Sequence, residues 1–142
     1  MRTILVPLFG MNELSLNAVN FAVHYAERSS AIPVFILFRK DLSGNIPDNS
    51  DSQSGCVELV IKELIHDYLV QEEAEDDRFF NLQEYELEIS KWVKKHDISE
   101  IVMSAPDNSN HLYPVFLEHV ESLKQTTNCR IITVKGLTER CK

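Results

Sequence analysis

The sequence predicts a doubly wound α/β fold, with a five-stranded parallel sheet between helices on both of its faces. Short apolar runs rich in β-branched and aromatic residues recur along the 142 residues, and longer segments of helical periodicity separate them. Each such segment is long enough to cross between neighbouring strands, so we expect parallel strands joined by right-handed crossovers. The length suits one domain, which we expect to span residues 1–142.

The strands are predicted from apolar runs without polar alternation, the pattern of strands that are covered on both faces. The five expected strands are Thr3–Leu8, Pro33–Phe38, Arg78–Leu82, Glu100–Ser104 and Arg130–Lys135. The third of them, Arg-Phe-Phe-Asn-Leu, carries the weakest signal because it is so short.

Four amphipathic helices are expected between the strands, because apolar residues recur there at helical spacing. Their predicted bounds are Leu14–Arg28, Val57–Glu73, Glu84–His96 and Pro114–Thr126. The inward-facing stripes are Leu14, Ala18, Phe21 or Ala22 and Tyr25 in the first helix, Val57, Val60, Ile61, Leu64, Ile65 and Tyr68 in the second, and Ile89, Trp92 and Val93 in the third. Pro114 suits the first turn of the fourth helix.

Two segments are expected to be less ordered than their neighbours. Asp41–Gly55 consists of turn-forming and helix-breaking residues and predicts a mobile loop. This loop could serve as a lid or bind a partner, although a tolerated surface insertion is the simpler explanation. The acidic run Glu72–Asp77 is interpreted as a solvated helix end, which should fray because carboxylates oppose the dipole at a helix C-terminus.

Charge and composition exclude several classes of partner. The net charge is −8, and residues 41–100 alone carry −11, against +2 for residues 1–40 and +1 for residues 101–142. Because there is no basic stripe, nucleic acid and anionic membranes are poor partners. The sequence has no apolar run of membrane-spanning length, and its start does not resemble a signal peptide. Three widely spaced cysteines make no disulfide framework, so we expect a cytoplasmic protein.

Catalytic and metal-binding motifs are scarce, and we expect neither an enzyme nor a metal site. There is no Gly-x-Ser-x-Gly and no P-loop. The five histidines are scattered, and each is expected at the surface or half-buried: His24, His66, His96, His111 and His119. Ser109, His111 and Asp107 lie too close together in one loop to form a triad. A phospho-receiver is excluded because Phe9-Gly10 and Asn81-Leu82 supply no acidic acceptor site.

Three segments together carry a resemblance that covers nearly the whole chain: Ile4–Gly10 with the following Leu14–Ala18, then Ile89–Ser104, and last Cys129–Val134. They resemble the universal stress protein family. The first segment is similar to the first strand, loop and helix of that family, the second to its third helix and fourth strand, and the third to its closing strand. The resemblance implies a Rossmann-like fold of the adenine nucleotide alpha hydrolase type. It also implies a regulatory or scaffolding role in stress through an unknown protein partner.

The resemblance breaks down at the positions that bind ATP in the family. Members that bind ATP carry Gly-x₂-Gly-x₉-Gly-Ser/Thr after the fourth strand and an Asp in the first loop. Here the four signature positions fall on Ser104, Asp107, Leu117 and Glu118, and the Asp position falls on Phe9. All five depart from the pattern, which is similar to the branch of the family that lacks ATP binding. No cofactor is therefore expected.

The chemistry of these residues supports the same prediction. Asp107 and Glu118 would repel phosphates, and Glu118, near the start of the fourth helix, would supply the negative charge that a phosphate brings to the helix dipole. A filled, vestigial pocket is expected. The alternatives are a sensor that holds a nucleotide such as AMP in an altered pocket and, least expected, an ATP-hydrolysing enzyme.

The last strand is expected to form a homodimer. Arg130, Ile131, Ile132, Thr133 and Val134 make a run without proline that readily pairs with another strand. The expected fold leaves this strand at an edge, and the resemblance implies antiparallel pairing of last strands, here centred near Ile132–Thr133. Alternatively, the tail Gly136–Lys142 covers the edge and the protein stays a monomer.

Overall fold

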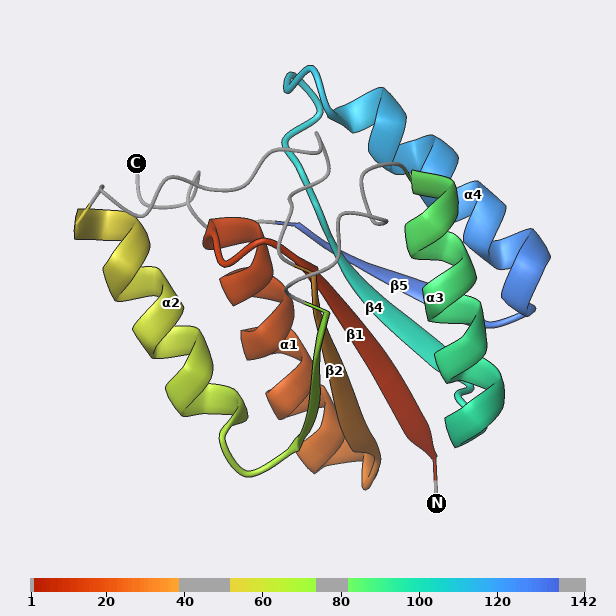
Figure 1. Cartoon of the computed structure of the whole chain (residues 1–142), viewed down its shortest axis with the longest axis horizontal. Helices are drawn as coiled ribbons and strands as arrows, with labels where there is room; N and C mark the ends of the chain where they lie inside the picture. Colours follow the sequence, from red (N-terminus) through yellow and green to blue (C-terminus); the bar gives the residue numbers. More distant parts are fainter. Residues whose placement is uncertain (1, 39–51, 74–81, 136–142) are drawn as a thin grey trace.

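The predicted α/β architecture is confirmed by a computed structural model that describes residues 2–38, 52–73 and 82–135 (Figure 1). All strands are parallel and join one sheet in the order β3-β2-β1-β4-β5. The elements are β1 (Thr3–Phe9), α1 (Glu13–Ser29), β2 (Ile32–Phe38), α2 (Ser52–Ile65), β3 (Leu69–Glu73), α3 (Leu82–His96), β4 (Glu100–Ala105), α4 (Tyr113–Thr127) and β5 (Arg130–Lys135).

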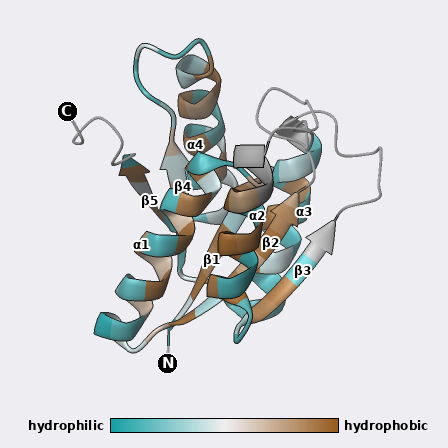
Figure 2. Ribbon diagram, turned by 90° about the vertical axis from the view of Figure 1, so that its left-hand side faces the viewer, coloured by the Kyte–Doolittle hydropathy of each residue, from teal (hydrophilic) through white to brown (hydrophobic). Residues whose placement is uncertain are grey.

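The core consists of two layers, one on each face of the sheet. Helices α1 and α2 cover one face, and α3 and α4 cover the other. Because successive side chains of a strand point to opposite faces, Ile4, Val6 and Leu8 of β1 pack under α1 and α2, whereas Leu5 and Phe9 pack under α3 and α4. Figure 2 shows β1 and β2 as apolar strands between these helices, which explains their unbroken apolar sequence.

The start and end of α1 are fixed by local hydrogen bonds. The Asn12 side chain accepts from the Ser15 backbone N–H at 3.0 Å and donates to the Phe9 carbonyl at 3.1 Å. At the other end, Ser30 takes the left-handed conformation and its N–H donates to the Ala26 carbonyl. The N-cap ties the turn after β1 to the helix, so the carboxyl end of β1 has a defined shape.

The third strand was placed wrongly from the sequence. It lies at Leu69–Glu73, where the sequence predicted the end of the second helix, and α2 stops at Ile65. The predicted strand at Arg78–Leu82 is wrong at Leu82, which begins α3, and residues 78–81 lie outside the described part. Tyr68 continues the helical stripe of Leu64 and Ile65, so periodicity could not show where the helix ends; pairing with β2 decides it.

Two smaller expectations also change. Helix α2 already begins at Ser52, so residues 52–55 are not part of a loop, and residues 41–51 lie outside the described part. Glu72 and Glu73 belong to β3 rather than to a frayed helix end, and residues 74–77 are not described.

The buried stripe of α1 is Ser15, Ala18, Val19, Ala22 and Ala26. Phe21 and Tyr25 therefore lie at its margin, where they stack on each other with ring centroids 5.5 Å apart.

A buried carboxylate at the start of β4 contacts the chain before β1, the start of β5 and the C-terminal half of α1. Glu100, at the start of β4, is 5% exposed and accepts hydrogen bonds from the Tyr25 hydroxyl at 3.0 and 3.1 Å. Its oxygens also lie 3.5 Å from the guanidinium groups of Arg2 and Arg130. The charge is thus paired and hydrogen-bonded, as a buried carboxylate requires, and it links β4 to β5, to α1 and to the chain before β1.

Candidate functional site

The candidate site lies where the sheet reverses its direction of winding. Strand β1 has β2 on one side and β4 on the other, so the crossovers after β1 and after β3 lead to opposite sides of β1. In sheets of this kind ligands bind outside the carboxyl ends of the strands at this point. Among the described residues, an open polar cleft and a smaller apolar pocket lie there.

The polar cleft encloses about 560 Å³ and lies between the start of α1, the loop after β4 and the end of β5. Its polar lining includes Glu13 and Asn17 of α1, Asp107 and Asn110 of the loop, and Lys135 of β5. The lining therefore combines two carboxylates with amides and a single ammonium group. This arrangement suits neutral or cationic groups better than a cluster of phosphates.

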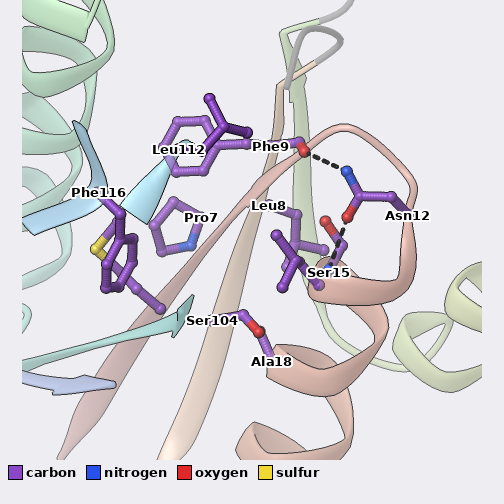
Figure 3. A pocket seen from close by; sticks show the side chains of 11 residues that line it. Pro7, Leu8, Phe9, Asn12, Ser15, Ala18, Ser104, Leu112 and Phe116 are labelled. Carbon is purple, nitrogen blue, oxygen red and sulfur yellow. Dashed lines mark hydrogen bonds between the residues drawn. The ribbon is translucent and has the colours of Figure 1, made fainter. Parts of the chain in front are cut away.

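The apolar pocket is much smaller, about 70 Å³, and lies between β1, α1 and the start of α4. Figure 3 shows the labelled side chains around it, among them Pro7, Leu8, Ala18 and Phe116. Ser104 brings a hydroxyl oxygen that is buried and has no hydrogen-bond partner among the described residues.

An aromatic cluster fills the space beside the end of β1. The ring of Phe9 stacks on Phe38 with centroids 5.2 Å apart and an interplanar angle of 14°. It also meets Tyr85 edge-on at 5.2 Å and the imidazole of His119 edge-on at 5.4 Å. Phe9 is only 9% exposed. The four rings come from β1, β2, α3 and α4. They fill the space at the carboxyl ends of β1 and β2, on the face of the sheet that α3 and α4 cover.

His119 is a buried polar residue beside the candidate site, and the sequence did not reveal its burial. It is 1% exposed, which makes the expectation of a surface or half-buried histidine wrong. Its Nδ1 lies 3.1 Å from Oε2 of Glu86, whose other oxygen accepts a hydrogen bond from the Ser122 hydroxyl. Its Nε2 is buried without a partner among the described residues. Burial lowers the pKa of His119, and the Glu86 carboxylate opposes that shift only in part.

Sequence spacing could not have found this cluster. His119 and Ser122 are three residues apart on α4, which is common on any helix, and Glu86 lies on α3, 33 residues before His119. Only the packing of α3 against α4 brings the carboxylate to the imidazole.

The five residues predicted at the degenerate nucleotide site separate into groups. Phe9 and Ser104 line the apolar pocket, and Asp107 and Leu117 line the polar cleft. The Asp107 carboxylate accepts a hydrogen bond from the Ser109 backbone N–H at 3.2 Å. Glu118 lines neither hollow.

The expectation that Glu118 compensates the dipole of the fourth helix is wrong. Helix α4 begins at Tyr113, which makes Glu118 its sixth residue, and its first turn has no acidic residue. The dipole effect is confined to the first turn. Pro114 does lie in that turn, as predicted.

Other chemistry finds no support in the described part of the chain. Within residues 2–38, 52–73 and 82–135 there is no group of three or more histidine, cysteine or carboxylate side chains that could hold a metal ion. No helix among these residues is long and apolar enough to cross a membrane. Asp107 binds the backbone rather than the hydroxyl of Ser109, so the geometry shows no relay to His111.

The comparison with solved structures agrees with the resemblance seen in the sequence. A universal stress protein in complex with cAMP aligns with a TM-score of 0.59 at 11% identity over 94% of this chain and 95% of the other. Universal stress protein UspA from Lactobacillus plantarum aligns with a TM-score of 0.56, 15% identity and coverage of 94% and 97%. The chain has the fold of the universal stress proteins.

Two further findings set the limits of this likeness. The universal stress protein from Archaeoglobus fulgidus in complex with dAMP aligns with a TM-score of 0.54, 13% identity and coverage of 95% and 98%. About half of a hydratase from Pseudomonas putida and about half of a deacetylase from Pyrococcus horikoshii also align with this chain, each with a TM-score of 0.50, at 9% and 8% identity. The alignments cover 88% and 89% of this chain but only 56% and 52% of the two enzymes. The fold alone therefore does not decide between binding and catalysis. Neither a family model nor a curated protein matches the sequence.

Proposed function

We propose that this protein is a universal stress protein-like regulatory or scaffolding module of the cytoplasm that acts through protein contacts. It is neither an enzyme nor an ATP-binding protein. The observation that carries the proposal is the aromatic cluster around Phe9, which occupies the position where the resemblance predicts the aspartate of ATP-binding members.

Packing and charge both oppose a nucleotide at this site. Phe9 stacks on Phe38 and meets Tyr85 and His119, so an incoming base would have to displace a buried ring. Asp107 and Glu13 add two carboxylates to the lining of the adjacent cleft. Unit charges about 4 Å apart repel by ~1 kcal/mol in water and ~4 kcal/mol at an effective dielectric constant of 20. A triphosphate would carry several such charges.

Titration calorimetry with Mg-ATP tests this proposal. We expect no measurable heat for the wild type, and a dissociation constant in the low micromolar range would refute it. Asp107→Asn is the matched variant, because it removes the charge and keeps the shape of the loop residue. If the variant is also silent, packing around Phe9 suffices to exclude ATP; if it binds ATP, the carboxylate is the deciding feature.

A sensor for AMP or a similar nucleotide is the second candidate. It is favoured by the volume of the polar cleft, about 560 Å³, and by fold neighbours solved with cAMP and dAMP. Thermal unfolding with AMP discriminates the two candidates, because a ligand at 100 times its dissociation constant stabilises a protein by about 2.7 kcal/mol. An unchanged melting temperature at millimolar AMP would leave the scaffolding role.

The proposed protein contacts include a homodimer through β5. Strand β5 ends the sheet, and the exposure of Thr133 and Lys135 alternates with the half-burial of Ile132 and Val134. The competing explanation is a monomer whose tail, residues 136–142, covers this edge; these residues lie outside the described part. Sedimentation at micromolar concentration decides, because a 16.3 kDa species would exclude the dimer.

A further inference from the structure

We infer that the apolar pocket between β1, α1 and the start of α4 binds a small neutral molecule with one hydrogen-bonding group, of the class of short alcohols and ketones. The inference goes beyond the proposed function, which assigns no ligand to this pocket. It follows from three features of the lining: its apolar walls, its lack of charge and a buried hydroxyl oxygen without a partner.

The walls of the pocket are apolar and come from several elements of the core. They consist of Pro7, Leu8 and Phe9 of β1, Leu14 and Ala18 of α1, Met103 of β4, and Leu112 and Phe116 around the start of α4. Because strands and helices supply the walls, the pocket does not need a loop to close before a ligand can enter.

The volume of the pocket limits the size of the ligand. An engineered apolar cavity of about 150 Å³ binds benzene, which has six heavy atoms. The pocket here has about 70 Å³, close to half of that volume. It therefore has room for roughly three or four heavy atoms.

The lining excludes a charged ligand. None of the described residues around the pocket is an aspartate, glutamate, lysine, arginine or histidine. A carboxylate or ammonium group placed there would be buried without a counter-ion, at a cost that so small a ligand cannot recover. The carboxylates of Glu13 and Asp107 line the polar cleft instead. The ligand of the apolar pocket must then be neutral.

Hydrogen bonds within the protein already use every polar side chain of the lining except one. The Asn12 amide donates to the Phe9 carbonyl at 3.1 Å and accepts from the Ser15 backbone N–H at 3.0 Å (Figure 3). The Ser15 hydroxyl donates to the Gly10 carbonyl. The Ser104 hydroxyl oxygen is buried and has no partner among the described residues. The lining thus offers a ligand one directional side-chain contact.

The Ser104 hydroxyl favours an organic ligand over a water molecule. Buried polar groups in proteins are nearly always hydrogen-bonded, and a hydroxyl can both donate and accept. A buried water needs two to four polar partners, whereas this lining has one free polar side chain. An alcohol or ketone needs only that one partner for its oxygen, and its carbon atoms contact the apolar walls.

Nuclear magnetic resonance titration with isopropanol tests the inference. We expect saturable shifts of the methyl resonances of Leu8, Ala18 and Met103, with a midpoint in the millimolar range that suits four heavy atoms. Isopropylammonium is the matched control, since it has the same heavy-atom skeleton and a positive charge, and it should give no saturable shift. Xenon, an apolar probe without a hydrogen bond, should shift the same resonances.

Two variants separate the hydroxyl from the apolar walls. Ser104→Ala removes the hydrogen bond and keeps the pocket, so it should weaken isopropanol about fivefold and leave xenon binding unchanged. Ala18→Val adds two carbon atoms to the wall and should weaken both probes. Circular dichroism checks that each variant is folded, and the Ser104 variant decides even if the Ala18 variant is not.

Several outcomes would overturn the inference. Isopropanol shifts that never saturate would show a solvent effect, and equal binding of isopropylammonium would contradict a neutral ligand. Unchanged isopropanol affinity in Ser104→Ala would remove the hydroxyl from the site. A clearly lower melting temperature of the same variant without any ligand would mean that the hydroxyl already has a partner, such as an ordered water that fills the pocket. The ATP titration does not depend on any of these results.

Discussion

Replacing Phe9 by alanine tests the packing that closes the candidate site. The ring is 9% exposed and contacts three other aromatic rings at centroid distances of 5.2–5.4 Å. Removing a buried phenylalanine costs about 3–5 kcal/mol through lost burial and the cavity that remains. Because typical domains unfold with about 5–15 kcal/mol, the loss would be a large part of the stability and should appear as a lower midpoint in urea.

Phe9→Leu is the matched control, since it keeps an apolar side chain and loses only the ring. A change of similar volume costs less than about 1.5 kcal/mol, so the difference between the two variants measures the cavity. A cycle with Phe38→Ala then isolates the stacked pair, and we expect a coupling of about 0.5–1.5 kcal/mol.

Urea unfolding followed by fluorescence and circular dichroism gives these free energies, provided that both probes report the same transition. A loss below about 1 kcal/mol for Phe9→Ala would mean that the ring is not packed as described. A coupling near zero with Phe38 would refute the stacked pair and would reopen the space beside β1 as a candidate ligand site.

Three further predictions concern titratable groups. Burial lowers the pKa of His119, so the unfolded state binds the proton more tightly than the folded state. The free energy of unfolding should therefore fall as the pH drops below about 6.5. His119→Asn should reduce this pH dependence, measured by urea titrations at about pH 5.5 and about pH 7.5. Glu100→Ala should cost about 1–3 kcal/mol in the same assay, because it leaves the Tyr25 hydroxyl without its acceptor, and Glu100→Gln, which keeps an acceptor, should cost less. Burial raises the pKa of the Cys129 thiol, so in a Cys141→Ser chain a thiol reagent should modify the exposed Cys56 first and Cys129 only on unfolding; equal rates would contradict its burial.

From the sequence, the candidate site could be predicted mainly by the ATP-binding signature that it lacks. The sequence shows that Phe9, Ser104, Asp107, Leu117 and Glu118 do not match an ATP signature. It could not show that Phe9 packs into a cluster, since Phe38, Tyr85 and His119 come from three other elements. It also could not show that Glu118 lies beyond the first turn of α4, because helix boundaries depend on local hydrogen bonds.

The sequence by itself determined the fold class, four of the five strands and the approximate place of every helix, because apolar runs and helical periodicity are local consequences of burial. The tertiary structure decided the rest. Pairing with β2 placed the third strand at Leu69–Glu73, where the sequence looked helical. The packing of α3 on α4 buried His119 against Glu86, which lies 33 residues earlier in the chain. These features depend on contacts between residues far apart in the chain, which no local pattern records.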